Sequence, residues 1–211
     1  MVADLGRQVA PDDKVSVDGN MVEKKHSHTY ILYNKPRGLL CSRKDAQGRP
    51  LIYDKLDVGP SVQSVGRLDM DSEGLLLLTD DGELAQALTH PSGGIDRKYR
   101  VRLTGTLELH TLQALRAGGV DMGNGDLSEP WNLTVDSETS GHTWISVTIR
   151  RGRWREIRRT LEGVGHTVRR LIRVQYGSLK LEDMPSNAWR TLKTKEIRNL
   201  RKLAGLSVTA T

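Results

Sequence analysis

The sequence predicts an α+β fold, with a mixed, largely antiparallel sheet and flanking helices. Short extended segments and short helical segments follow one another without the regular strand–helix–strand alternation of a doubly wound sheet. Several extended segments alternate polar and apolar residues, as half-buried strands do. The 211 residues, 36% of them hydrophobic, are sufficient for a real core. Because only 4% are aromatic, that core must consist mainly of Leu, Val and Ile.

The first elements divide the chain into two parts. Residues 15–17 form a short alternating run, which the turn pair Asp18-Gly19 closes, and a polar stretch follows. We therefore interpret residues 1–25 as an appendage with a linker and residues 26–206 as the main domain.

The main domain begins with strand-like segments. Residues 30–33 are extended in character, and a second extended region ends at Val65. The four leucines within residues 74–79 are too few for an independent helix. We expect a buried strand there, followed by a turn at residues 80–82.

The remaining elements alternate between helical and extended periodicity. Helices are expected where apolar residues recur at i and i+4 and where proline or glycine marks an end, over 83–90, 107–117, the segment from Gly152 to Val164, and 196–203. Strands are expected over 99–103, 131–135, 144–149, 169–174 and 177–181, with the second and third forming a hairpin.

The charge balance favours a polyanionic partner, since 32 Lys and Arg oppose 26 Asp and Glu and give a net charge of +6. The single Cys41 excludes an internal disulfide framework and fits a reducing cytosol. No apolar stretch is long enough to span a membrane, and the N-terminus lacks the pattern of a signal peptide. We expect a cytoplasmic protein without membrane contact.

The familiar cofactor motifs are missing from the sequence. Six scattered His and one Cys offer no zinc-ligand spacing, and His26 with His28 forms only a weak metal pattern. Neither a Walker A loop nor a dinucleotide-binding glycine fingerprint occurs. We expect no metal and no cofactor.

An arginine-rich segment stands out in the C-terminal half. Nine arginines within 24 residues are opposed only by two glutamates: Arg150, Arg151, Arg153, Arg155, Arg158, Arg159, Arg169, Arg170 and Arg173. On a helix, Arg155, Arg158 and Arg159 would share one face, where they could grip phosphates or a carboxylate. A solvated charged face is the alternative, and the pattern alone leaves both open.

A second feature is the segment Gly66-Arg67-Leu68-Asp69, where an extended region gives way to a loop. Loops held on a rigid sheet are common places for catalytic groups. An Asp at the end of a strand is, however, most often a turn-former that hydrogen-bonds its own backbone. The spacing by itself decides nothing.

This segment carries a family resemblance. Residues 66–82 are similar to the signature block of the ribosomal-RNA pseudouridine synthases of the RsuA/RluB/RluE/RluF family. Further blocks agree in order and spacing: Lys35-Pro36-Arg37-Gly38, Arg97-Lys98-Tyr99-Arg100-Val101, and Gly152-Arg153-Trp154-Arg155-Glu156-Ile157-Arg158-Arg159. The last block continues to 170–173 and Tyr176-Gly177, as in members acting on large-subunit (23S) RNA, the RluB-like branch. The resemblance covers about residues 28 to 205 and implies the pseudouridine synthase catalytic fold.

The resemblance also implies roles for individual residues. Asp69 would attack the target nucleoside as nucleophile or base, and Arg67 would help to displace the target base from its stack. Tyr99 would stack on the uracil, Leu171 would pack beneath it, and Arg158 would pair with Asp69. Contacts to the RNA are expected from four further residues: Lys35, Arg37, Arg155 and Arg159.

The implied reaction isomerises a specific uridine of ribosomal RNA to pseudouridine. It is redox-neutral, so it needs no metal, nucleotide or electron carrier, which agrees with the missing motifs. A carboxylate can act covalently or remove a proton to give a glycal, and the sequence leaves both open. We expect a monomer whose partner is ribosomal RNA.

Two other functions remain as alternatives. A non-catalytic RNA-binding module would share the charge and the arginines, but it would not need Asp69 among them. A metal-dependent nuclease or phosphotransferase would need converging carboxylates, for which the candidates are Asp69, Asp71, Asp80 and Asp81.

The N-terminal segment resembles part of a second module. Residues 5–22 are similar to the final stretch of the small S4-type RNA-binding domain with which larger relatives begin. The helices that would grip RNA are not present in this segment. We therefore expect residues 1–25 to be a remnant of that domain plus a linker.

Overall fold

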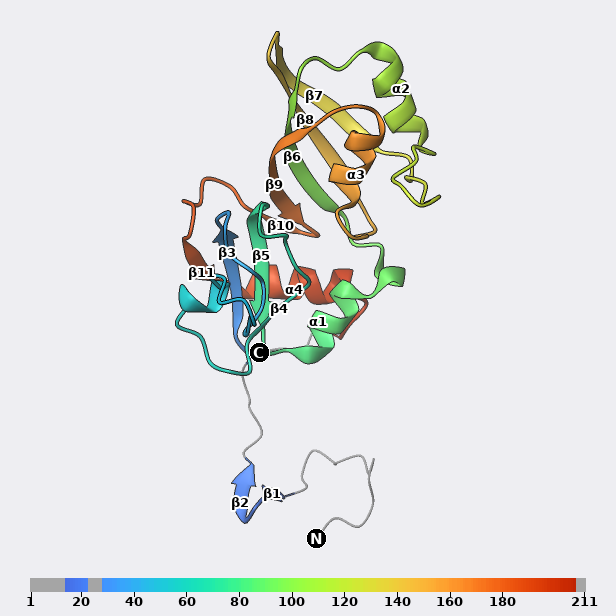
Figure 1. The fold of residues 1–211 in the computed structure, drawn as a ribbon. Helices are drawn as coiled ribbons and strands as arrows, with labels where there is room; N and C mark the ends of the chain where they lie inside the picture. Colours follow the sequence, from blue (N-terminus) through green and yellow to red (C-terminus); the bar gives the residue numbers. More distant parts are fainter. Residues whose placement is uncertain (1–13, 23–27, 208–211) are drawn as a thin grey trace.

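The computed structural model describes residues 14–22 and 28–207. These residues form a two-stranded hairpin, a nine-stranded mixed sheet and four α-helices (Figure 1). The hairpin joins β1 (Val15–Val17) to β2 (Asn20–Val22) and confirms the strand predicted there. Most of the proposed appendage, residues 1–13 and 23–25, lies outside the described residues, so its relation to an S4-type domain stays a prediction.

The predicted mixed, largely antiparallel sheet is confirmed. Its main path runs β11-β3-β5-β9-β6-β8-β7, and only the pairing of β5 with β9 is parallel. The strands are β3 (Tyr30–Lys35), β4 (Gln63–Ser64), β5 (Glu73–Thr79), β6 (Arg97–Thr104), β7 (Asn132–Thr139), β8 (His142–Ile149), β9 (Val168–Tyr176), β10 (Leu179–Lys180) and β11 (Trp189–Thr191).

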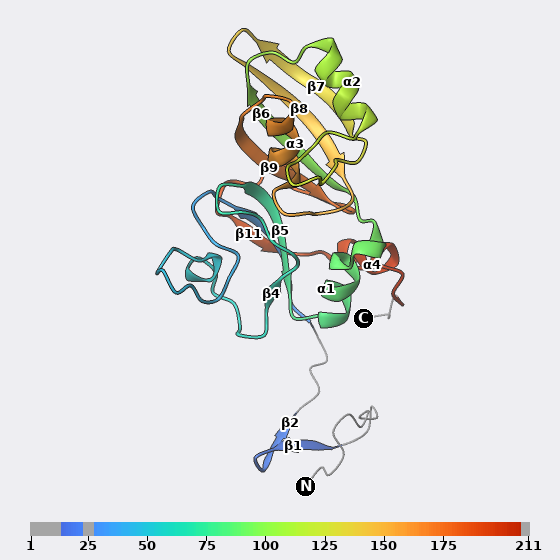
Figure 2. The same cartoon turned by 45° about the vertical axis from the view of Figure 1, so that its right-hand side comes forward.

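The helices lie against both halves of the sheet. They are α1 (Gly82–Thr89), α2 (Leu109–Ala117), α3 (Glu156–Gly163) and α4 (Thr194–Leu203), with short 3-10 turns at Ile52–Asp54 and Pro91–Gly93. In both views α2 and α3 accompany the half built from β6, β7 and β8, whereas α1 and α4 accompany the half that contains β3 and β5 (Figures 1 and 2).

The leucine run of β5 is buried on both faces of the sheet. Leu76 and Leu78 belong to one hydrophobic core, and Leu75 and Leu77 belong to a second core on the opposite face. Because successive side chains of a strand point to opposite faces, a strand between two cores needs an uninterrupted apolar sequence. This explains why residues 74–79 lack the alternation seen in β6.

The two halves of the sheet meet at one short contact. β5 and β9 pair only through Glu73 with Ile172 and through Gly74 with Arg173. A Cβ at Gly74, where φ is +103°, would lie 2.3 Å from the Arg173 carbonyl oxygen, so the approach of the strands depends on glycine. The cavity described below opens beside this junction.

Candidate active site

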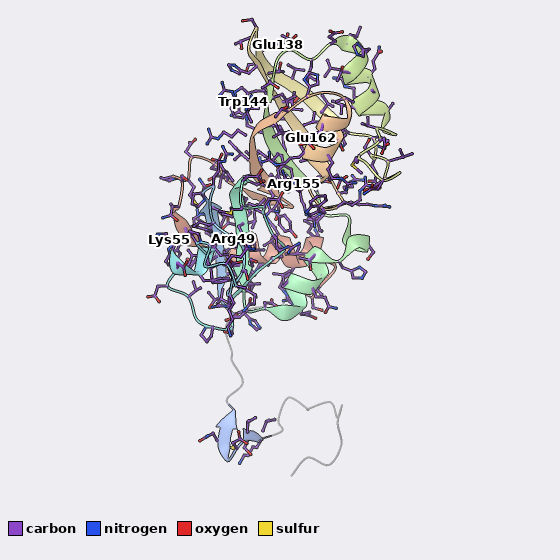
Figure 3. All side chains as sticks on the ribbon, viewed as in Figure 1. Arg49, Lys55, Glu138, Trp144, Arg155 and Glu162 are labelled. Atoms are coloured by element: carbon purple, nitrogen blue, oxygen red, sulfur yellow. The ribbon has the colours of Figure 1, made fainter. Side chains whose placement is uncertain are left out.

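A cavity of about 420 Å³ lies where the two halves of the sheet meet. Its wall is built from the segment before β5, the first residues of β6, the loop before α3, and β9: Gly66, Arg67, Leu68, Asp69, Tyr99, Arg155, Leu171 and Arg173 are among the lining residues. The label of Arg155 in Figure 3 lies at this junction. The size falls within the range of ordinary small-molecule pockets.

Asp69 is presented by a tight loop between β4 and β5. Leu68 is buried in the first core and anchors the loop, while the Asp69 side chain remains 38% exposed. The Ser72 amide donates to the Asp69 carbonyl at 3.0 Å, which closes the turn. The carboxylate therefore faces the cavity from a fixed backbone.

Lys35 holds this loop from below and does not contact solvent, which corrects its predicted role in RNA binding. Its side chain is fully buried, and Nζ donates to the carbonyls of Pro36 (3.0 Å), Asp69 (3.2 Å) and Ser72 (3.0 Å). Burial lowers the pKa of Lys35, and nearby negative groups, including Asp69, oppose this shift. Its neighbour Arg37 is exposed, as a residue that contacts RNA must be.

The arginine that reaches Asp69 is Arg155, not Arg158 as expected. Arg155 Nη1 lies 3.8 Å from Asp69 Oδ2 and 3.2 Å from Asp71 Oδ1. Arg158 Nη2 lies instead 3.2 Å from Asp71 Oδ2, and it donates to the Asp71 carbonyl at 3.0 Å. Arg158 is thus connected to Asp69 through the backbone and side chain of Asp71.

The difference arises at the start of α3. The helix begins at Glu156, and Arg155 precedes it with a left-handed backbone (φ +48°), so Arg155 does not share a helix face with the later arginines. Arg158, in the first turn, has a side chain only 5% exposed and also donates to the Val168 carbonyl. Burial lowers the pKa of Arg158, and Asp71 opposes this shift.

Arg159 is also placed differently from the expectation that it contacts the RNA. Its Nε donates to the Met122 carbonyl at 2.8 Å, and Nη1 pairs with Asp126 at 3.1 Å. The side chain is 17% exposed. Arg159 therefore braces the loop before β7, and its donors are largely used.

Tyr99 and Leu171 lie side by side, as their predicted roles require. They occupy the adjacent strands β6 and β9, where Leu171 pairs with Val101, and both are buried against the first core. Both line the cavity, and the exposed Arg67 lies at its rim. The structure thus brings Asp69, Arg67 and the two apolar residues to one cavity.

Sequence reasoning missed two residues of this site. Trp154 is 69% exposed and lines both the cavity and a second hollow next to it, with the Arg159 guanidinium 5.6 Å from its ring. Arg173 was counted with the phosphate-binding arginines, but it is buried in the cavity wall. A solitary aromatic residue within the arginine-rich segment was the available signal for Trp154.

The carboxylates that a nuclease would need do not converge. Asp69 and Asp71 face arginines, whereas Asp80 and Asp81 follow β5, whose seven residues span about 20 Å at the usual rise of a strand. Asp81 caps α1 and pairs with Arg201. Among the described residues, no group of three or more His, Cys, Asp or Glu is arranged to hold a metal ion.

No helix within residues 14–22 and 28–207 has the length and apolar character needed to cross a membrane.

Cys41 is a free cysteine, and its sulfur accepts a hydrogen bond from the Leu68 amide at 3.4 Å. Burial raises the pKa of the Cys41 thiol, so it packs under the Asp69 loop as a protonated group.

The chain is similar to known proteins of one family. The model of the RNA pseudouridylate synthase family matches residues 29–163. The chain is 38% identical over 200 residues to ribosomal large subunit pseudouridine synthase B of Haemophilus influenzae, covering 92% of this chain and 56% of that protein. For the protein of the same name from Salmonella typhimurium, the identity is 38% over 214 residues, covering 97% and 73%.

A solved structure is similar over most of its length. A crystal structure of a pseudouridylate synthase superposes with a TM-score of 0.75 at 28% identity, covering 92% of this chain and 83% of that chain. Against the relatives from H. influenzae, Yersinia pestis and Pasteurella multocida, the chain spans 56%, 65% and 57% of their respective lengths.

Proposed function

Because the chain belongs to the RNA pseudouridylate synthase family, we propose that it isomerises a specific uridine of large-subunit ribosomal RNA to pseudouridine. The observation that carries the proposal is a half-exposed carboxylate, Asp69, facing a cavity with Tyr99 and Leu171 in its wall. The choice of large-subunit RNA is supported by the names of the relatives, which are about 38% identical.

The target nucleotide must leave its stack to reach this cavity. Enzymes that act on a base extrude it into a pocket and replace its stacking partners. Arg67, exposed at the rim, would occupy the space that the base leaves, and Tyr99 and Leu171 would enclose the uracil ring. These three residues therefore bind and orient the base.

Asp69 is the proposed catalytic residue. In the reaction the bond between C1′ and N1 breaks, the uracil turns, and a bond between C1′ and C5 forms; the C5 proton is lost and N1 gains one. A carboxylate can add to the sugar, add to the base, or take a sugar proton to give a glycal. All three routes need a carboxylate aimed at the nucleoside, and the Arg155 guanidinium, 3.8 Å away, can hold Asp69 in that direction.

Arg158 acts as a positioning residue in this scheme. Arg158 does not line the cavity and forms no ion pair with Asp69. It pairs with the Asp71 carboxylate and donates to the Asp71 carbonyl, so it fixes Asp71 in place. Since Asp71 and Asp69 share the ion pair with Arg155, a shift of Asp71 would move the catalytic carboxylate.

RNA would bind across the rim of the cavity. Within the described part of the chain, Arg37 and Arg67 are exposed and form no ion pair, so their charges are available for phosphates. Trp154 offers a stacking surface between the two hollows. Residues 26–206 would form the catalytic domain, and residues 1–25 would be an N-terminal segment, similar to part of an S4-type domain, with a linker.

One chain supplies every proposed group, so we expect a monomer that acts in the cytoplasm, where ribosomal RNA is found. The reaction exchanges bonds within the substrate and needs no cofactor. A non-catalytic RNA-binding module would not require the buried support beneath Asp69.

Mapping of pseudouridine in ribosomal RNA from cells with and without the protein tests the proposal. We expect one large-subunit uridine to lose its modification in cells without the protein and to regain it when the protein is supplied. Re-supply of Asp57→Asn, a change at an exposed carboxylate outside the cavity lining, serves as the positive control. Unchanged modification at every position would refute the proposed function, and loss at a small-subunit uridine would refute the choice of RNA.

A further inference from the structure

Arg173 is a buried cation without an acidic partner in the cavity wall. The residue is 2% exposed, and it forms no ion pair with any carboxylate of the described residues. Its Nε donates to the Leu75 carbonyl at 2.7 Å, its guanidinium lies 5.1 Å from the Tyr176 ring, and its Nη2 has no hydrogen-bond partner. The other deeply buried arginine beside the site, Arg158, has Asp71 as a counter-charge.

The position of Arg173 between two strands keeps its side chain from turning out to solvent. On β9 it pairs with Gly74 of β5 on one side and with Tyr99 of β6 on the other. The contact with Gly74 is so close that no side chain fits between the strands there. Arg173 is therefore held where β5 and β9 separate, next to the residues that would enclose the base.

A second orphaned group lines the same cavity. Ser72 is 1% exposed, and its Oγ has no hydrogen-bond partner, although its carbonyl accepts from Lys35. Ser72 lies in the loop immediately before β5, next to Glu73, which pairs with Ile172 of β9. Buried polar groups are almost always paired, so unpaired donors and acceptors in a cavity wall indicate a polar ligand.

We infer that Arg173 and Ser72 bind the edge of the uracil, with Arg173 Nη2 donating to O4 and Ser72 Oγ accepting from N3–H. This inference rests on the proposed function and names the specificity of the same cavity. Hydrogen bonds to the pairing edge are the usual means by which an extruded base is identified. Cytosine has an amino group in place of O4. That amino group would face the Arg173 guanidinium, two donors would meet, and cytosine would be rejected.

The uracil edge also suits the turn that the base must make. A half-turn about the line through N3 and C6 brings C5 to the place of N1 and exchanges O2 with O4. The same guanidinium and hydroxyl then meet a carbonyl and the same N3–H, before and after the turn. When the bond between C1′ and N1 breaks, the uracil takes the electron pair, and a cation on its carbonyl stabilises the resulting negative charge.

The test combines protein variants with substrate atoms. Single-turnover rates at saturating enzyme are measured for the parental protein and for Arg173→Met, on RNA carrying uridine, 4-thiouridine or 2-thiouridine at the target position. Sulfur accepts hydrogen bonds poorly, and any intrinsic effect of sulfur cancels in the ratio between proteins. We expect Arg173→Met to slow the uridine substrate by about 10- to 150-fold, the worth of a hydrogen bond to a charged group, and to slow the 4-thio substrate much less. The 2-thio substrate keeps O4 while the bond between C1′ and N1 breaks, so it should retain most of the effect.

Arg97→Met is the matched control. Its guanidinium lies 5.3 Å from the same Tyr176 ring and lines the same cavity, but it donates to carbonyls of the protein, including Ile95 at 3.4 Å. Its effect should be equal on all three substrates. Arg173→Lys carries the same comparison if the Met variant does not fold, because a shorter ammonium loses the contact with O4.

The outcomes separate the two levels of the proposal. If Arg173→Met slows all three substrates equally, Arg173 has only a structural role and the inference is wrong. If the parental protein forms no pseudouridine at all, the proposed function fails first.

Discussion

Replacing Lys35 by Met tests whether the loop that carries Asp69 is held from inside the protein. Met keeps the unbranched stem and its volume, so the main change is the loss of an ammonium that donates to three carbonyls. A net contribution of about 1 to 1.5 kcal/mol for each hydrogen bond gives a loss of about 3 to 5 kcal/mol in the free energy of unfolding. This is a large part of the roughly 5 to 15 kcal/mol that stabilises a typical domain.

The assay is urea unfolding combined with RNA binding. We expect the midpoint of Lys35→Met to fall while the slope with denaturant stays constant, since the folded and unfolded surfaces hardly change. RNA binding is measured without urea, at a temperature where the variant is folded. Its RNA affinity should fall with salt as steeply as that of the parental protein, because Nζ is buried and contacts no phosphate.

Lys98→Met is the control, since Lys98 is exposed on β6 and its loss should leave stability within about 0.5 kcal/mol. If Lys35→Met is as stable as this control, Lys35 does not support the loop. If Lys35→Met reduces the salt dependence of RNA binding, Lys35 has the RNA-binding role first expected of it.

Three further predictions concern the arginines, the exposed aromatic residue and pH. Arg155→Met should lower the single-turnover rate at least tenfold and lower the free energy of unfolding by less than about 1 kcal/mol. Arg158→Met should lower the rate too, and it should lower the free energy of unfolding by about 2 kcal/mol. Thermal unfolding and single-turnover kinetics of both variants separate these effects. Trp154→Ala should weaken RNA binding by about 5- to 150-fold, the value of one stacked base, with an unchanged rate at saturation, and a titration that shows no loss would exclude stacking. Burial raises the pKa of Tyr33 to about 12, so the folded protein keeps a proton that the unfolded chain has lost, and stability should fall as the pH rises above 10. Tyr33→Phe should flatten that part of the profile, and an identical profile would contradict the argument.

Most of the fold follows from local patterns in the sequence. Alternation identified β6 and the hairpin of β7 and β8, and the leucine run identified β5 as a buried strand. β11 carries only three residues, and its pairing with β3 joins positions about 160 residues apart, which no local pattern contains. The parallel contact between β5 and β9 was hidden for the same reason.

The sequence identified which residues lie together at the site better than it identified which of them contact one another. The grouping of Asp69, Tyr99 and Leu171 came from a family resemblance, and the structure brings all three to one cavity. The arginine contacts were misassigned because helical spacing was extended to Arg155, whose left-handed backbone lies outside the helix. Burial of Lys35 could not be seen either, because a charged residue at the end of a strand gives no local sign of three carbonyls converging on it.

The central claim is that the Asp69 carboxylate converts uridine to pseudouridine. The most direct measurement is tritium release from large-subunit RNA labelled at uracil C5, since formation of the new bond to C5 expels that hydrogen. Asp69→Asn keeps the size of the side chain and removes the charge, so we predict RNA binding within a few-fold of the parental protein and no release above background. Release at a substantial fraction of the parental rate would contradict the account.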